Sequence, residues 1–143
     1  MQDKKVIDAI LRDSRTVAMV GLSNKEDRPS NRVARYLLAH GFQVIPVNPA
    51  LSEALGQKAY PDLTSIPVKV DVVDIFRRSE DVPPIVEEAI AIGAKVVWMQ
   101  EGIVSEAAAE RARSAGLLVV MDHCMKKEHE KRHRAAIGAK ASG

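Results

Sequence analysis

Residues 16–30 constrain the fold of this chain more than any other stretch, because they join a strand, a glycine turn and a helix start. Residues 17–21 form a short apolar run with β-branched members, which is too short for a helix and predicts a buried strand. The run ends at Gly21 in a polar loop, and Pro29 and Ser30 are typical first residues of a helix. A helix N-terminus offers free N–H groups and a positive dipole end, so this corner predicts an anion site.

The loop after Gly21 matches neither of the common nucleotide fingerprints. A dinucleotide fingerprint reads Gly-x-Gly-x-x-Gly, whereas Gly21 is followed by Leu-Ser-Asn-Lys, and no Gly-Lys-Ser/Thr phosphate loop is present. The alternative is that Gly21 only permits a tight turn, although the polar residues 23–25 make the loop longer than a simple connection needs. If the backbone approaches a ligand here, Gly21→Val should weaken binding more than it weakens folding.

Composition bounds the class of protein. The 143 residues predict one domain over 1–137 with a flexible tail at 138–143. A net charge of +2 is too small to indicate a nucleic-acid partner, and five aromatic residues offer few platforms for base stacking. No apolar run approaches the roughly 20 residues that cross a bilayer, so no membrane partner is expected. A single cysteine, Cys124, and no signal peptide favour the cytoplasm.

Apolar runs predict five strands that alternate with helices. The expected strands are 17–21, 42–47, 70–76, 95–99 and 117–121. Helices are expected over 6–11, 29–40, from Ser79 or Asp81 to about 92, over 105–115 and from Met125 onward. This alternation is typical of βαβ units, and it predicts a Rossmann-like, doubly wound α/β fold, a three-layer α/β/α arrangement with a parallel sheet between helices. We expect the strand order 3-2-1-4-5.

In such sheets ligands bind beyond the carboxyl ends of the strands, so five loops should form one site. The loops are 21–23, 47–49, 76–78, 100–102 and 122–124. Cations on or beside them suit a polyphosphate, or alternatively are solvated surface charges; they are Lys25, Arg28, Arg32, Arg77 and Arg78. The acidic residue that holds the NAD ribose after the second strand is missing, because 47–49 reads Val-Asn-Pro.

Several short motifs follow one another in a fixed order. They are Val-Gly-Leu-Ser (20–23), Arg-Pro-Ser (28–30), Val-Ala-Arg-Tyr-Leu (33–37), Pro-Val-Asn-Pro (46–49), Asp-Val-Val-Asp-Ile-Phe-Arg-Arg (71–78), Glu-Ala-Ile-Ala-Ile-Gly-Ala (88–94), Val-Trp-Met-Gln-Glu-Gly-Ile (97–103) and Val-Met-Asp-His-Cys (120–124). With these motifs the chain, over about residues 6–130, resembles the small stand-alone CoA-binding proteins. Those proteins are similar to the amino-terminal CoA-binding domain of the succinyl-CoA synthetase alpha subunit.

The resemblance implies that coenzyme A or an acyl-CoA binds without catalysis, through phosphate and adenine contacts at the carboxyl ends of the strands. It places phosphates against the loop 23–30, the nucleotide against 47–49 and a closing wall at 76–79. The full set of implied CoA-binding residues is Gly21, Ser23, Asn24, Lys25, Arg28, Pro29, Ser30, Val47, Asn48, Pro49, Phe76, Arg77, Arg78, Ser79, Gln100 and Gly102.

Two departures from the synthetase matter. Ala50 and Leu51 stand where the synthetase has a lysine after the second-strand proline, which removes one phosphate contact. The phosphorylated catalytic histidine of the synthetase lies in a second domain with no counterpart in these residues. The resemblance therefore implies binding and gives no ground for ligase activity.

Three further features bear on chemistry. Cys124 could act as a catalytic thiol only with a base oriented toward it, which adjacency in sequence does not supply; a milder hypothesis is a mixed disulfide with the CoA thiol. His129 and His133 have the spacing of a zinc pair, but cationic neighbours favour a solvated helix face and no metal. Glu101 could be a base, although capping the turn at 103–105 is the simpler interpretation.

Two other functions stay open at this point. One is a small NAD(P)- or nucleotide-dependent enzyme that uses Glu101 or His123 as its acid/base group. The other is a regulatory module whose pocket senses CoA. The sequence indicates no particular protein partner.

Overall fold

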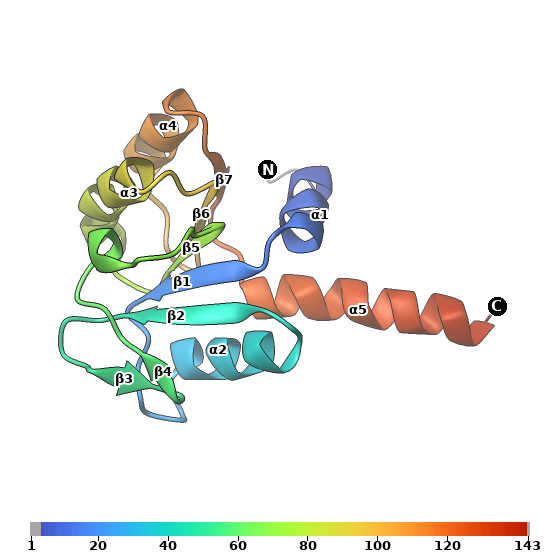
Figure 1. The fold of residues 1–143 in the computed structure, drawn as a ribbon. Helices are drawn as coiled ribbons and strands as arrows, with labels where there is room; N and C mark the ends of the chain where they lie inside the picture. The colour runs from blue at the N-terminus through green and yellow to red at the C-terminus, as the bar shows by residue number, and fades with distance from the viewer. Residues whose placement is uncertain (1–3, 143) are drawn as a thin grey trace.

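The computed structural model describes the backbone of residues 4–142 and the side chains of residues 4–137. Its centre is a parallel sheet of five strands in the order β2-β1-β5-β6-β7 (Figure 1). The strands are β1 (Thr16–Val20), β2 (Gln43–Val47), β5 (Val72–Ile75), β6 (Val96–Met99) and β7 (Leu118–Val120). Each begins and ends within two residues of its expected position, and the Rossmann-like fold class is confirmed.

The predicted strand order 3-2-1-4-5 is wrong. Counted along the chain, the five long strands lie in the order 2-1-3-4-5, so β5 pairs with β1 and β6. The outer edge of β2 is covered instead by the segment around Tyr60, whose backbone bridges Val47 and bonds to Pro46 O and Asn48 N at 3.0 and 2.9 Å. Next to it lies a hairpin of β3 (Glu53–Ala54) and β4 (Gln57–Lys58), which is absent from the predicted strands.

The order matters because it moves the point where the chain reverses its direction of winding. In the observed sheet this switch point lies between β1 and β5, and ligands of wound sheets bind at such a point. The loops after Val20 and Ile75 are therefore direct neighbours.

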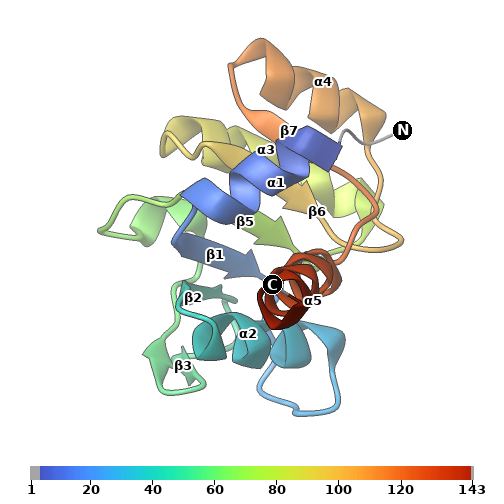
Figure 2. The ribbon, with the colours of Figure 1, turned by 90° about the vertical axis from the view of Figure 1, so that its right-hand side faces the viewer.

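Helices cover both faces of the sheet. On one face lie α1 (Lys4–Asp13), α2 (Pro29–Ala39) and α5 (Met125–Ser142). Figure 2 shows α1 and α5 in front of the strands. On the other face lie α3 (Val82–Ala91) and α4 (Glu106–Ser114). Short 3-10 turns at Leu63–Ser65 and Ser79–Asp81 precede β5 and α3. Each face carries its own buried apolar cluster, and Trp98 is fully buried in the cluster beneath α1 and α5.

Helix α5 is bound to α2 through aromatic and imidazole rings. The Tyr36 hydroxyl lies 2.7 Å from Nδ1 of His129, and the rings of His40 and His133 contact that of His129. The expectation of a solvated helix face is wrong for the half-buried His129, whereas His133 is exposed. Among the residues that the structure describes, no group of three or more histidine, cysteine or acidic residues could hold a metal ion.

The C-terminal segment 138–142, expected to be a flexible tail, continues α5 in the structure. Its flexibility stays a prediction, and residue 143 lies outside the described residues. Within the described chain no helix combines the length and the apolar composition that a membrane span requires.

Candidate ligand-binding site

Gly21 stands at the junction between the loops after β1 and β5. Its φ of +90° is unfavourable for residues with a side chain, and an added Cβ would lie 2.7 Å from the carbonyl oxygen of Phe76. The same Cβ would lie 3.1 Å from Cδ of Arg77. The glycine therefore serves close packing of two loops within the protein, in addition to any approach of a ligand.

Two clefts open at this junction, and both are lined by Gly21 and Arg77. The larger has a volume of about 670 Å³ and runs from the start of α2 to the start of α5. Ten of the expected CoA-binding residues line it; they are Gly21, Ser23, Lys25, Arg28, Pro29, Ser30, Phe76, Arg77, Arg78 and Gln100. Val33, Glu101, Ile103 and Cys124 complete its wall.

The start of α2 forms one end of the larger cleft. Pro29 is the first helical residue and has no N–H, and no side chain caps this helix. Within the described residues, the backbone N–H groups of Ser30 and Asn31 have no acceptor. The N–H of Ser23 is not free, since it donates to Oγ of Ser30 at 3.0 Å. The predicted anion corner is therefore present but smaller than the sequence suggests.

The cations of the larger cleft differ in how they are paired. No acceptor or acidic partner for the side chains of Lys25, Arg28 and Arg77 occurs in the part of the chain that the structure describes. Arg78 is engaged with Glu80 and Asp81 at 3.3 and 3.4 Å. The first three side chains are therefore available for an anion, and charge-assisted bonds to phosphate are among the stronger hydrogen bonds.

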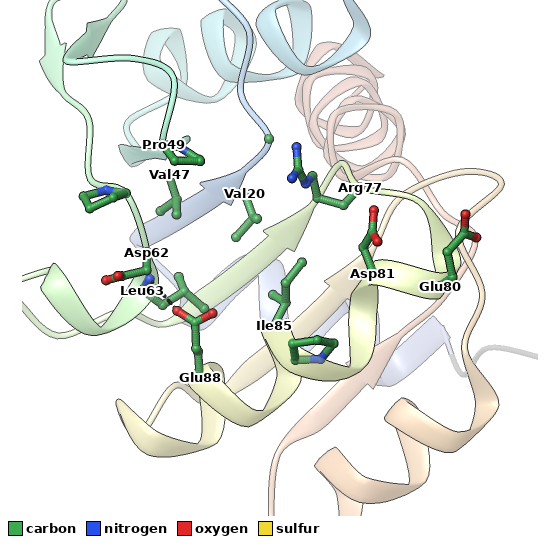
Figure 3. Close-up of a pocket in the computed structure, with 13 residues that line it drawn as sticks. Val20, Val47, Pro49, Asp62, Leu63, Arg77, Glu80, Asp81, Ile85 and Glu88 are labelled. Carbon is green, nitrogen blue, oxygen red and sulfur yellow. Dashed lines mark hydrogen bonds between the residues drawn. The ribbon is translucent and has the colours of Figure 1, made fainter.

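The smaller cleft, of about 320 Å³, lies beyond the ends of β1 and β2 against α3 (Figure 3). Val20, Val47, Leu63 and Ile85 give it an apolar floor, and three prolines contribute to its walls. Four carboxylates also line it, and Arg77 is the only cation that the described side chains contribute; the acids are Asp62, Glu80, Asp81 and Glu88. Figure 3 shows Asp62 and Glu88 on the side opposite Arg77.

Sequence reasoning missed most of this cleft. Gly21, Val47, Pro49 and Arg77 belong to the expected site, whereas the walls from the loop 61–63 and from α3 were not expected. These residues carry no recognisable motif, and they meet only because of the strand order. The carboxylate of Glu88 accepts from Leu63 N at 3.0 Å, which ties the loop to α3.

Four of the expected ligand residues lie outside both clefts and bond within the protein. Nδ2 of Asn24 donates to Glu53 O, and Nδ2 of Asn48 donates to Leu22 O. Oγ of Ser79 accepts from Val104 N, and the N–H of Gly102 donates to Asp122. Their contact with a ligand stays a prediction.

Two other expected side chains also have internal roles. Arg32 likewise lies outside both clefts, and its guanidinium donates to Asp27 O. Glu101 does not cap the turn at 103–105. The cap of α4 is Ser105, whose Oγ accepts from Ala108 N, while Glu101 accepts from Lys127 at 2.9 Å. This partner raises the pKa of Lys127.

The other candidate acid/base group, His123, also has an acidic partner. Its Nδ1 lies 3.4 Å from Glu128, a carboxylate that is almost buried. Burial raises the pKa of Glu128, but hydrogen bonds from Arg132, Lys131 and His123 outweigh that effect and leave the pKa lowered. Glu128 is thus charged, and its ion pairs stabilise the start of α5. It is not a candidate general acid.

A family model described as a CoA binding domain matches residues 15–130, which is most of the chain and both clefts. The chain belongs to this CoA binding domain family. The resemblance drawn from the ordered motifs is thereby confirmed.

Relatives of this CoA binding domain include stand-alone chains and one part of a larger enzyme. The uncharacterized protein YneT of Bacillus subtilis is 42% identical over 88% of this chain and 93% of its own. A hypothetical protein from Pyrococcus horikoshii OT3 has a TM-score of 0.88 and 43% identity over 91% of this chain and 92% of its own. The ADP-forming acetate–CoA ligase II of Archaeoglobus fulgidus is 31% identical over 57% of this chain, which corresponds to 12% of the ligase.

Proposed function

We propose that this chain binds coenzyme A or an acyl-CoA across its two clefts, as a binding protein without catalysis of its own. The adenine ring enters the smaller cleft, the diphosphate lies where Gly21 and Arg77 border both clefts, and the pantetheine arm follows the larger cleft. The observation that carries the proposal is the division of charge, acidic in the smaller cleft and cationic in the larger. Membership of the CoA binding domain family supports the identity of the ligand.

The smaller cleft suits a neutral base better than a phosphate. Its apolar floor and prolines can sandwich a flat ring, and its volume is at the lower end of the roughly 300–1,000 Å³ common for ligand pockets. Across the described residues, no donor reaches Oδ2 of Asp62 or Oε2 of Glu88. These oxygens can accept from the exocyclic amino group of adenine, whereas like charge disfavours phosphate there.

The larger cleft has the features that a diphosphate needs. The free N–H groups of Ser30 and Asn31 and the positive end of α2 favour an anion. Lys25, Arg28 and Arg77 supply positive charge, and in the described chain none of these three side chains forms an ion pair.

Binding without catalysis is supported by the state of the acid/base candidates. Glu101 is held by Lys127 and His123 by Glu128, so each has a charged partner within the protein. A general base must instead reach the proton that it removes from a substrate.

Titration calorimetry with CoA, dephospho-CoA, NAD and ATP tests the ligand. We expect CoA to bind in preference to the others, and Arg77→Ala to weaken CoA binding about 5- to 150-fold, which corresponds to about 1–3 kcal/mol for a bond to a charged group. Arg113→Ala is the matched control, because this arginine lies exposed on α4 and lines neither cleft. It should keep the affinity of the natural chain.

Three results contradict the proposal. Heat from NAD with none from CoA would favour a nucleotide-dependent enzyme. Unchanged affinity in Arg77→Ala would make that arginine a solvated surface charge. Continuous release of free thiol from an acyl-CoA would show catalysis.

A further inference from the structure

We propose that Cys124 is a site of covalent modification, at which its thiol forms a mixed disulfide with the pantetheine thiol of CoA. The inference rests on the proposed function, because it needs CoA in the larger cleft. Cys124 is the chain's only cysteine and has no disulfide partner. The residue is 7% exposed and lines the larger cleft, so a ligand that fills this cleft lies against it.

Gln100 gives independent evidence of a ligand at this end. The residue is 5% exposed and lines the cleft beside Cys124. Its Oε1 accepts from Met125 N at 3.2 Å, which fixes the amide and holds the start of α5 against the end of β6. Its Nε2 has no acceptor among the residues of known position, so this donor is free for a group in the cleft. The pantetheine arm carries two amide carbonyls that can accept it.

The surroundings of Gln100 and Cys124 match the rest of that arm. Phe76, Ile103 and Val33 supply apolar surface in the same cleft, as a methylene-rich chain requires. Two of the unpaired cations, Lys25 and Arg28, belong to the loop that leads into α2, where the free N–H groups also lie. A ligand anchored there by its phosphates therefore extends its uncharged end toward Cys124.

The place of Cys124 in the chain also favours exchange chemistry. Cys124 directly precedes α5, and its carbonyl accepts the first helical bond, from Glu128 N at 3.0 Å. The positive end of the helix dipole favours an anion at that place.

The reaction is a thiol–disulfide exchange with CoA disulfide as the oxidant. The Cys124 thiolate attacks one sulfur of CoA disulfide, the S–S bond of the reagent breaks, and a new S–S bond joins Cys124 to one CoA. The second CoA leaves as a thiolate and takes up the proton that Cys124 lost. Cys124 and one half of the reagent share the oxidised state, and one CoA is released reduced.

Intact-mass spectrometry of the full chain measures the rate of adduct formation with CoA disulfide and, in parallel, with cystamine, a small disulfide that has no nucleotide. We expect one CoA per chain and a rate that exceeds the cystamine rate by about tenfold or more, the factor that 1.4 kcal/mol of binding supplies. Arg77→Ala should slow the reaction with CoA disulfide about 5- to 150-fold, whereas Arg113→Ala should not. Reduced CoA added first should protect Cys124 from alkylation.

Calorimetry with Cys124→Ser separates failure of this inference from failure of the proposed function. If that variant binds CoA but the natural chain gives no adduct, the binding function stands and the covalent step is overturned. If neither binding nor adduct is seen, both are overturned. Equal rates with CoA disulfide and cystamine also overturn the inference, because they show an ordinary thiol that the cleft does not direct.

Discussion

Two residues near the carboxyl edge of the sheet, Gly21 and Asp74, are restricted by packing and burial inside the protein as well as by any ligand. Gly21 was expected to admit a ligand to the backbone, yet the atom that most tightly restricts it is the carbonyl oxygen of Phe76. Asp74 is fully buried in β5, and neither of its carboxylate oxygens has a hydrogen-bond partner among the described residues. Both positions give tests of folding that need no ligand.

Gly21→Ala should destabilise the fold, contrary to the expectation that a larger side chain there mainly weakens binding. Gly116 has the same φ of +90°, but an added Cβ there meets no atom of the described chain within 4 Å. Gly116→Ala should therefore lower the free energy of unfolding by only about 1 kcal/mol, the cost of a side chain at positive φ. Gly21→Ala should lower it clearly more. Urea denaturation measures both. Equal losses would show that the loops after β1 and β5 separate without strain.

Asp74→Val should stabilise the protein by about 1–3 kcal/mol at neutral pH, because it removes an unsatisfied buried carboxyl group and suits a strand. Asp71→Val, only three positions earlier, should destabilise it by a similar amount. The carboxylate of Asp71 accepts from Arg15 N and Thr16 N at 2.9 and 3.0 Å. Urea midpoints of the two variants show whether the hydrogen bonds of an aspartate decide if its replacement by valine raises or lowers the stability of the fold.

The gain in Asp74→Val should depend on pH. Burial raises the pKa of Asp74 well above its ordinary 3.8, so the folded state holds a proton that the unfolded state releases. The contribution of Asp74 to the stability of the natural chain therefore falls as pH rises above 3.8, and the advantage of the variant should grow from about pH 3 to about pH 7. An advantage that shrinks over this range would mean that Asp74 is charged when folded.

At the scale of elements, local signals predict most helices and strands, and tertiary contacts decide the rest. Pro29 marks the start of α2 and Ser105 caps α4, as their residue types predict. The hairpin β3–β4 has only two residues per strand, too few for a pattern. The burial of His129 could not be predicted, since it depends on Tyr36 and His40 of a helix far away in sequence.

The contact between α2 and α5 should make folding sensitive to mildly acidic pH. Burial, then the neighbouring His40, His133 and Arg132, lower the pKa of His129 from 6.5, and Glu130 opposes them only in part. The unfolded state then binds more protons below pH 6.5, so stability should fall as pH drops through that value.

His129→Asn should reduce this loss, because asparagine can still accept from Tyr36 but cannot take up a proton. His133→Asn changes an exposed position on the same helix, and this variant should still lose most of the stability that the natural chain loses at acidic pH. Urea midpoints between about pH 5 and pH 8 compare the three chains. A slope that is unchanged in His129→Asn would assign the pH dependence to other groups.

At the scale of the whole molecule, the sequence predicts a wound parallel sheet and places the binding edge, but not the path of the chain across it. Right-handed crossovers are compatible with both strand orders, and the choice depends on Tyr60 taking the outer edge of β2. The larger cleft was largely predictable, because its loops follow strands directly. The acidic wall around Asp62 and Glu88 was not, since that wall exists only once β5 lies beside β1.

Trp98 gives this arrangement a built-in optical reporter. It is the chain's only tryptophan, it is fully buried in β6, and its Nε1 donates to His123 O at 2.9 Å. The next residue along the chain from His123 is Cys124, on the wall of the larger cleft. Fluorescence emission from a single indole should therefore follow both unfolding of the core and changes beside Cys124 in the larger cleft, without an attached dye.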